Sequence, residues 1–295
     1  MLIRFWGVRG SVPVPGPTTV RYGGNTTCIQ VVTAEGRLII IDAGTGIRLL
    51  GLDLMKSEFA QGRGEAHILF THTHWDHIQG FPFFPPAYVG VRDDQGNKLD
   101  QRCNTFHLYG ESDVDDRLEA TLRGQMEHFY FPVDLAYLNA FMHFHPVKNK
   151  PLAIGNTTIT ARRLIHPNGV LGYRIEDAGK IFVVATDCEH PSDGSIDANL
   201  LELARDADLL VYDCQYTEEE YDPARFGLSG PPRFGWGHST PQEAIRAAQA
   251  ANVKRLLMTH HEPQRSDDAL DALVAKMQAV FPSIDAAREG LEITL

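Results

Sequence analysis

Short apolar runs, each directly followed by a polar residue, are the feature that most limits the fold of this chain. The runs are rich in Ile, Leu and Val, and the side chain that follows each can bind a metal ion or a proton. They are 38–41 before Asp42, 68–71 before His72, 181–186 before Asp187, 209–212 before Asp213 and 255–259 before His260. Such runs predict strands buried on both faces, so further layers must cover both sides of the sheet. Because ligands bind beyond the carboxyl ends of strands in open α/β folds, we expect the functional site at that edge.

Helices are expected between these runs. The clearest one begins after Thr240, which has the place of an N-cap, with Pro241 at the first helical position and Glu243 at the spacing of a capping box. Other helices are expected at about 47–54, 113–125 and 267–280. Residues 81–165 contain proline and aromatic clusters and no regular run of strands, so we interpret them as an elaboration on a single domain that spans residues 1–295.

Charge and cysteine content narrow the range of partners. The formal net charge of -11 opposes loose binding to long nucleic acid, whose phosphates attract clustered Lys and Arg. The four cysteines are widely spaced and form no C-x-x-C pair, which predicts buried free thiols. No signal peptide is recognisable, and no apolar stretch reaches the roughly 18 residues of a membrane span, so we expect a cytoplasmic protein with a small substrate.

The segment 71–77, with the sequence THTHWDH, contains three imidazoles and one carboxylate: His72, His74, Asp76 and His77. A tight loop at the end of a strand can present all four side chains to a common point. Imidazole and carboxylate groups are ligands for Zn, Mn, Fe or Ni. This segment therefore predicts a metal site.

The pattern His-x-His-x-Asp-His after a buried strand resembles the signature of the metallo-β-lactamase superfamily. The segment 42–46 before the motif, and a later histidine, a later aspartate and a final histidine after it, follow the order found in that family and cover most of the chain. The resemblance implies an α/β fold of the αββα type, with two mixed sheets flanked by helices and two metal ions at one edge of the sheets.

The same resemblance implies the ligands. His72, His74 and His166 correspond to the first metal, Asp76, His77 and the final histidine to the second, and Asp187 to a carboxylate that bridges both. His260 and His261 are both candidates for the final histidine. We prefer His260 because it directly follows the strand, whereas His261 would point to the opposite side of an extended chain. Two divalent ions, Zn or Mn, are the expected cofactors.

The resemblance also implies the chemistry. Water held between two metals has its pKa lowered toward neutrality, which predicts hydrolysis, and Asp76 is expected to orient this nucleophile. His238 lies just before the capped helix and resembles the histidine of the His-Ser-Thr loop in the phosphodiesterase branch, which includes tRNA 3′-processing ribonucleases and cyclic-nucleotide phosphodiesterases. There it would stabilise a phosphate or protonate the leaving oxygen. The alternative is that His238 merely precedes an N-cap.

Within that branch, a tRNA nuclease is expected to carry a basic, glycine-rich arm, and the sequence shows none. The segments 4–11 and 23–27 resemble instead a bacterial subgroup similar to cyclic-nucleotide phosphodiesterases, so a small phosphodiester is the predicted substrate. Arg9, Ser11 and Asn25 are candidates for phosphate contacts, although arginine beside glycine-rich turns is also common for structural reasons. The branch also predicts a homodimer.

Several alternatives stay open at this point. A thioesterase or lactamase, a mononuclear-iron dioxygenase and a noncatalytic binding protein could share the fold. The aromatic residues at 81–84 and Trp75 would either stack on a nucleobase or pack in the core. His190, which closely follows Asp187, would either line the site or lie in an exposed loop.

Overall fold

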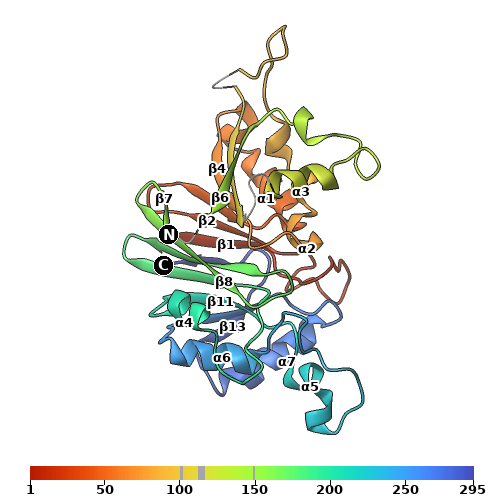
Figure 1. Cartoon of the computed structure of the whole chain (residues 1–295), viewed down its shortest axis with the longest axis vertical. Coiled ribbons are helices and arrows are strands. Elements are labelled where there is room, and N and C mark those ends of the chain that lie inside the picture. Colours follow the sequence, from red (N-terminus) through yellow and green to blue (C-terminus); the bar gives the residue numbers. More distant parts are fainter. Residues whose placement is uncertain (100–101, 112–116, 149) are drawn as a thin grey trace.

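The computed structural model contains two seven-stranded sheets that pack face to face (Figure 1). It describes residues 1–99, 102–111, 117–148 and 150–295. Most of the first sheet comes from the first half of the chain and the whole second sheet from the second half. The last strand returns to the first sheet and pairs with the first strand of the chain.

The first sheet is antiparallel at one end and parallel at the other. Its strands, in spatial order, are β14 (Glu292–Thr294), β1 (Leu2–Gly7), β2 (Cys28–Val32), β3 (Leu38–Ile41), β4 (Glu65–Leu69), β5 (Thr105–Glu111) and β6 (Phe141–Val147). Neighbours from β14 to β3 are antiparallel, and those from β3 to β6 are parallel. The carboxyl ends of the parallel strands therefore share one edge.

The second sheet has the same mixed character. Its strands, in spatial order, are β13 (Ile284–Ala286), β12 (Leu256–Thr259), β11 (Leu209–Asp213), β10 (Lys180–Ala185), β9 (Val170–Asp177), β8 (Thr157–Leu164) and β7 (Leu152–Ile154). The pairs between β10 and β13 are parallel, and those between β7 and β10 are antiparallel. The polar strand-end residues of both sheets lie at the edge where the parallel strands end.

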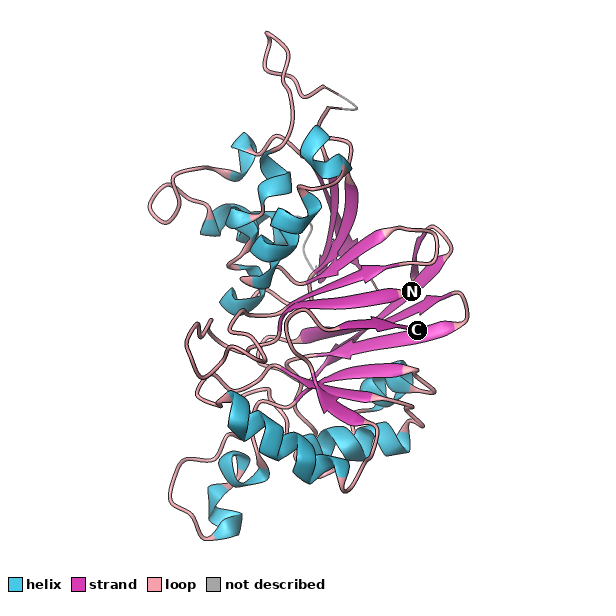
Figure 2. Cartoon of the chain, turned by 180° about the vertical axis from the view of Figure 1, so that it is seen from behind, coloured by secondary structure: helices cyan, strands magenta, loops and turns pink. Residues whose placement is uncertain are grey.

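Helices cover the outer face of each sheet, as the view from behind also shows (Figure 2). Those on the first sheet are α1 (Gly46–Leu54), α2 (Trp75–Ile78) and α3 (Arg117–Gln125), with the short 3-10 helices Glu58–Gln61, Phe81–Phe83, Pro85–Tyr88 and Leu135–Tyr137. Those on the side of the second sheet are α4 (Ala198–Ala204), α6 (Pro241–Ala250) and α7 (Asp267–Gln278), while α5 (Glu218–Tyr221) and the 3-10 helix Pro223–Phe226 form an outlying loop.

Three apolar cores separate these four layers. In β3, Ile39 and Ile41 face the second sheet, whereas Leu38 and Ile40 face the helices of the first. A strand that is buried on both faces needs apolar residues at every position, which explains the uninterrupted runs in the sequence. The predicted αββα sandwich is confirmed.

The region 81–165 differs from the prediction because it supplies four strands, β5 to β8, to the two sheets. In β5 the fully buried Phe106 and Leu108 alternate with the partly exposed His107 and Tyr109, so no continuous apolar run marks the strand. A one-domain division of the chain stays a prediction.

The predicted helices are present with small shifts. Helix α6 begins after Thr240, whose side chain accepts a hydrogen bond from the backbone of Glu243 at 3.3 Å, but the Glu243 side chain pairs with Arg246 instead of closing the capping box. Helix α3 begins at Arg117, and the start expected at 113–116 lies outside the described residues. All four cysteines are buried free thiols, as predicted. Among the described residues, no helix is long and apolar enough to cross a bilayer.

Candidate metal centre

The side chains of the candidate centre are attached directly after strands, and three of them have unusual backbone geometry. Asp42 follows β3, Asp187 lies two residues after β10, and His260 follows β12; their φ angles are +61°, +52° and +57°. Residues other than glycine rarely adopt this left-handed region, which costs roughly 1–3 kcal/mol each and clusters at functional sites. The surrounding fold holds these three side chains at one edge in spite of that cost.

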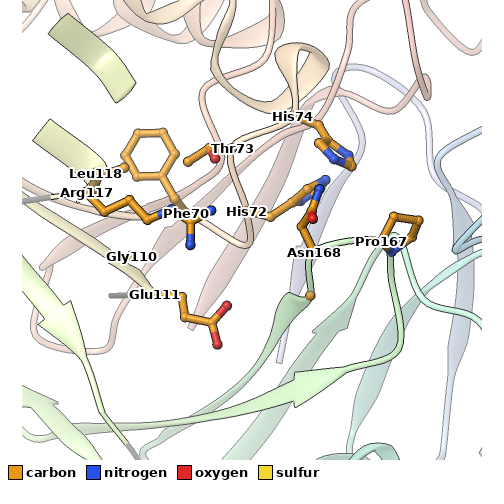
Figure 3. Close-up of a pocket in the computed structure, with 11 residues that line it drawn as sticks. Phe70, His72, Thr73, His74, Gly110, Glu111, Arg117, Leu118, Pro167 and Asn168 are labelled. Atoms are coloured by element: carbon orange, nitrogen blue, oxygen red, sulfur yellow. The ribbon is translucent and has the colours of Figure 1, made fainter. Parts of the chain in front are cut away.

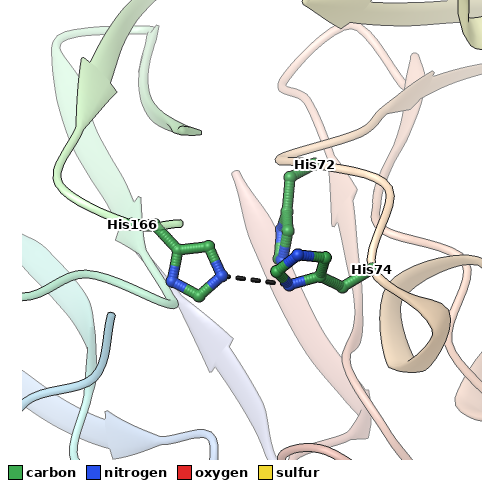
Figure 4. Close-up of side chains that lie close together, drawn as sticks. All are labelled: His72, His74 and His166. Carbon is green, nitrogen blue, oxygen red and sulfur yellow. Dashed lines mark hydrogen bonds between the residues drawn. The ribbon is translucent and has the colours of Figure 1, made fainter. Parts of the chain in front are cut away.

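The first cluster consists of His72 and His74, from the loop after β4, and His166, from the loop after β8 (Figure 4). His166 Nε2 lies 3.0 Å from His74 Nδ1, and the His72 ring centroid is 4.5 Å from that of His74 and 4.8 Å from that of His166. The structure therefore brings together the three residues that the sequence assigned to a first metal.

The second cluster consists of Asp76, His77, Asp187 and His260, all of them buried. His77 Nε2 lies 3.2 Å from Asp187 Oδ1 and 3.3 Å from Asp76 Oδ2, while His260 Nε2 lies 3.1 Å from Asp76 and 3.2 Å from Asp187. Asp187 is also 3.8 Å from His72 Nε2 in the first cluster. Its carboxylate thus lies between the two groups, at the place expected of a bridging ligand.

The second nitrogen of these histidines is held by a partner outside the clusters. His77 Nδ1 lies 2.8 Å from Asp42 Oδ2, His166 Nδ1 lies 2.9 Å from the carbonyl of Gly237, and His260 Nδ1 lies 2.9 Å from Gln215 Oε1. Such partners fix the tautomer and orientation of histidines that ligate metals. They leave Nε2 of each ring to face the cluster.

Two buried nitrogens show that the residues fit a cation. His72 Nε2 and His77 Nε2 have no hydrogen-bond partner among the described residues, although both rings are enclosed. A buried polar atom without a partner is costly, and a metal ion between the imidazoles and carboxylates would satisfy both nitrogens. The two groups therefore suit divalent ions with mixed nitrogen and oxygen ligands.

Opposite charges hold the metal-free cluster together. Burial alone would raise the pKa of Asp76 and Asp187, but the nearby rings of His77 and His260 keep the pKa of both carboxyls below the usual range. Burial opposes protonation of the two histidines, yet Asp187 and Asp76 raise the pKa of His77 well above its normal value and that of His260 to about 9. Protons on these two rings thus neutralise the carboxylates. A metal ion that binds here must displace these protons.

His238 lies beside both clusters and is paired with a carboxylate. Its Nδ1 lies 2.8 Å from Asp213 Oδ2, and its ring stacks on that of His260 with centroids 4.9 Å apart. Asp213 is fully buried and also accepts a hydrogen bond from the backbone of Gln215 at 2.9 Å. This pair keeps the His238 ring in one orientation, with Nδ1 toward Asp213 and Nε2 on the opposite side of the ring.

Three supporting residues had no assigned role in the sequence interpretation. Asp42 and Asp213 were noted only as strand-end carboxylates, and that shared position is the signal by which both could have been found. Gln215, two residues after β11, gave no comparable signal.

Two of the three candidates for phosphate contact, Arg9 and Asn25, have side chains that are engaged elsewhere, which corrects that part of the hypothesis, whereas a contact from the exposed Ser11 stays a prediction. Arg9 is completely buried, and its guanidinium donates to the carbonyls of Gly23, Glu262 and Arg265. The backbone N–H of Ser11 donates to Asp76 Oδ2 at 2.8 Å.

Asn25 donates to both carboxylate oxygens of Glu289, at 2.7 Å from its backbone and 3.0 Å from its side chain. Gly10 makes room for the imidazole of His260, since a Cβ at Gly10 would lie 2.4 Å from His260 Nδ1. Gly10 and Ser11 of the first glycine-rich segment therefore lie directly against the candidate ligands His260 and Asp76.

His261 lies outside the clusters: it is buried, and its Nε2 donates to the carbonyl of Ala287 at 2.8 Å. His260 is the histidine of this pair that faces Asp76 and Asp187.

Cavities adjoin the centre on two sides. A small one of about 90 Å³ has His72 and His74 in its wall together with Glu111 and Arg117 (Figure 3). A larger one of about 720 Å³ has His238 in its wall, and His190 also lines it, so this histidine does not lie in an exposed loop.

The aromatic residues near the motif divide between the core and the surface, and stacking on a nucleobase stays a prediction. Phe81 and Phe84 are fully buried in the core under the first sheet. Phe83 and Trp75 are 55% and 73% exposed and line a separate cavity of about 430 Å³.

The sequence of this chain matches a model of a known protein family and the sequences of curated relatives. A family model described as "Beta-lactamase superfamily domain" matches residues 37–261. Ribonuclease Z of Archaeoglobus fulgidus is 33% identical over 332 residues, which cover 99% of this chain and 97% of that protein.

Two solved structures share the fold at lower identity. The short form of human tRNase Z has a TM-score of 0.66 and 21% identity, covering 100% of this chain and 99% of its own. Zn(2+)-bound PqqB from Methylobacterium extorquens has a TM-score of 0.68 and 16% identity, covering 100% of both chains.

Proposed function

The chain belongs to the β-lactamase superfamily, and from this membership and the geometry of the site we propose that it hydrolyses phosphodiesters with the help of two divalent metal ions. The family and the general class of metal-dependent hydrolase are those predicted from the sequence. The phosphodiester specificity, the number of ions and the roles of single residues are parts of the proposal.

We assign the ions to the two clusters. His72, His74 and His166 would hold the first, Asp76, His77 and His260 the second, and Asp187 would contact both. Zn or Mn suits these ligands. Divalent ions supply Lewis-acid chemistry here, because they lower the pKa of water and stabilise negative charge on the attacked phosphate.

Asp76 has a carboxylate that can serve both an ion and the nucleophile. Its Oδ2 already receives hydrogen bonds from the backbone of Ser11 at 2.8 Å and from His260 at 3.1 Å, so its orientation is fixed. The low pKa of Asp76 keeps it ionised, which allows it to accept a hydrogen bond from the attacking water.

The His238–Asp213 pair is the single observation that carries the phosphodiester proposal. A proton donor is needed when the leaving group is a poorly stabilised alkoxide, and the 2.8 Å contact with Asp213 holds the His238 ring beside the clusters. The Asp213 carboxylate accepts a hydrogen bond from Nδ1 of His238, so the other ring nitrogen, Nε2, is the atom that would pass a proton to the leaving oxygen.

We propose a small phosphodiester, such as a cyclic nucleotide or a dinucleotide, as the substrate. The formal net charge of -11 disfavours long RNA, whereas the names of the relatives, ribonuclease Z and tRNase Z, favour it. This contrast makes substrate length a necessary part of the test. A homodimer remains a prediction that size-exclusion chromatography can check.

The test uses purified full-length protein loaded with Zn or Mn. Bis-p-nitrophenyl phosphate, a cyclic nucleotide, a dinucleotide, a tRNA precursor, a β-lactam and a thioester are offered in parallel. We expect turnover of the small phosphodiesters only, and none after Asp76→Ala.

Absence of phosphodiester turnover in protein that holds its ions would refute the proposal. Turnover of the β-lactam or thioester would assign the site to acyl transfer instead. A higher kcat/KM for the tRNA precursor than for the dinucleotide would overturn the preference for small substrates. One bound iron with oxygen consumption would indicate a dioxygenase.

A further inference from the structure

Four histidines outside the candidate centre lie together on one face of the first sheet. They are His67 on β4, His107 on β5, and His143 and His145 on β6. Successive side chains of a strand point to opposite faces, and Phe106 packs in the core on the helix side, so His107 lies on the other face. His67, His107 and His143 are partners in the parallel register of the three strands. A row of imidazoles therefore crosses this end of the sheet.

Two of these rings have nitrogens at the spacing of a chelate. His107 Nδ1 lies 3.0 Å from His145 Nε2, the same distance that separates His166 Nε2 from His74 Nδ1 in the first cluster of the candidate centre. Two nitrogens that each bind one ion at about 2.0–2.1 Å are roughly 3 Å apart. In the metal-free chain a hydrogen bond joins them. When His145 carries its proton on Nδ1 instead, both facing nitrogens can offer a lone pair to an ion.

The neighbours of His107 and His145 favour this role. Glu65 Oε1 lies 3.6 Å from His107 Nε2, and a carboxylate at that side of the ring favours a proton on Nε2, which leaves Nδ1 as the ligand atom. The His145 ring stacks on Tyr109 with centroids 4.7 Å apart, which holds its plane. Burial and the adjacent imidazoles lower the pKa of His107 and His145, so both rings are neutral at neutral pH. Histidine must be neutral to bind a metal.

His143 can supply a third nitrogen from the edge of the sheet. It lies two residues before His145 on the same strand, so both point to the same face. Its ring centroid is 5.1 Å from that of His107, and its side chain is exposed. Strand β6 ends the order of the first sheet, which leaves this side chain room to turn toward the other two rings.

We propose that His107, His143 and His145 form a further metal site, separate from the candidate centre, for a divalent transition-metal ion such as Zn²⁺, Ni²⁺ or Cu²⁺. Imidazole ligands suit these ions, whereas Mg²⁺ and Ca²⁺ prefer oxygen. The bound ion links β5 to the edge strand β6. The site does not depend on the proposed hydrolysis.

The zinc content of the full-length protein tests this site. Metal-free wild type and variants are dialysed against a zinc buffer whose free zinc concentration just saturates the wild type, and the bound zinc is counted by atomic absorption. His145→Gln and His143→Gln should each bind one zinc fewer per chain than the wild type. His128→Gln, at an exposed histidine outside this row, is the matched control and should bind as much as the wild type.

Two further measurements separate this site from the candidate centre. Turnover of bis-p-nitrophenyl phosphate by the zinc-loaded protein should be the same in His143→Gln as in the wild type. Because only the difference in zinc content is used, the result does not depend on how many ions the candidate centre holds. Circular dichroism establishes that each variant is folded, and His143→Gln changes an exposed side chain, so it keeps the test valid if His145→Gln does not fold.

Equal zinc content in the wild type and in folded His143→Gln and His145→Gln would overturn the site. An equal loss in His128→Gln would also overturn it, because the zinc would then be bound by exposed histidines in general. Loss of the additional zinc in His238→Ala, with none in His145→Gln, would assign that ion to the group of Asp187, Asp213, His238 and His260 and contradict the proposal.

Discussion

Replacing Asp42 by Asn tests whether the metal centre depends on residues outside its ligand set. The Asp42 carboxylate is fully buried and makes three contacts of 2.8 Å, with Thr71 N, Thr71 Oγ1 and His77 Nδ1. Asn has the same shape and tolerates the φ of +61° at this position. The substitution thus changes charge and hydrogen bonding while the backbone geometry is retained.

The expected loss follows from the tautomer of His77. In Asp42→Asn one oxygen can still accept from Thr71 N, but the amide NH₂ then takes the place of Oδ2 and faces His77 Nδ1. Two donors cannot face each other, so His77 must move its proton to Nε2, the atom that lies 3.2 Å from Asp187. A protonated Nε2 cannot bind a metal. Loss of such a partner typically costs 10- to 100-fold in metal affinity, or about 1.4–2.7 kcal/mol.

The affinity can be measured by competition between the protein and a chromophoric zinc chelator. The wild type should take up zinc in two steps, and Asp42→Asn should weaken one of them by about 10- to 100-fold. Gln79→Leu is a matched control, because its amide donates to Thr26 near the centre but touches neither cluster.

An unchanged zinc affinity in folded Asp42→Asn protein would refute this reasoning. Weakening of the first-cluster step alone would also contradict it, since Asp42 contacts His77 directly and reaches His72 only through the hydroxyl of Thr71. Circular dichroism of the metal-free variant establishes whether the fold is intact.

Three further predictions follow from the geometry. His238→Ala and Asp213→Asn should each lower kcat on an alkyl phosphodiester by about 10²- to 10⁴-fold, with less effect on p-nitrophenyl esters, and the double variant should be no slower than the worse single one, as steady-state kinetics will show. Arg9→Met leaves three carbonyls without their donor and should reduce the free energy of unfolding by roughly 3 kcal/mol in urea titrations, while KM stays the same. The pKa of His260 is raised to about 9, so its stabilising proton is fully bound below its unfolded pKa and is lost as the pH rises through 9. Thermal denaturation of metal-free protein should therefore show falling stability between about pH 7 and about pH 10, and bound metal should remove this trend.

The sequence predicts the strands that are buried on both faces and misses those that are not. Every residue of β3 and β11 is buried, and nearly continuous apolar runs mark both strands. In contrast, β5 has one face against helices and another that carries His107 and Tyr109 at the partly exposed end of the sandwich. Buried and partly exposed residues alternate over the seven residues of β5, but the partly exposed ones are polar and the strand lies among proline-rich segments. This pattern is too weak to identify the strand.

The candidate site was predictable to the extent that its residues follow strands. His72 and His260 lie at strand ends in the sequence, and the fold brings those ends to one edge. The pairing of His238 with Asp213 depends on a contact across 25 residues, which no local pattern reports. Arg9 shows the opposite limit: an arginine among glycines resembles a phosphate contact until the structure shows that the side chain is completely buried and that its Nε and Nη1 donate to backbone carbonyls.

Two residues with strained backbone at strand ends, Asp187 and His260, are also proposed metal ligands. Asp187 and His260 leave their strands with a positive φ, and the enclosed His260 ring fits only because residue 10 has no side chain. Strain of roughly 1–3 kcal/mol at each position and the desolvation of two carboxylates and two imidazoles all oppose folding in the absence of an ion. Bound metal offsets these terms, since an ion at 100 times its Kd stabilises the native state by about 2.7 kcal/mol. His260→Gly would relieve the backbone strain but would also remove a metal ligand and the ring that neutralises Asp76 and Asp187, so both the metal affinity and the stability of the metal-free chain should fall.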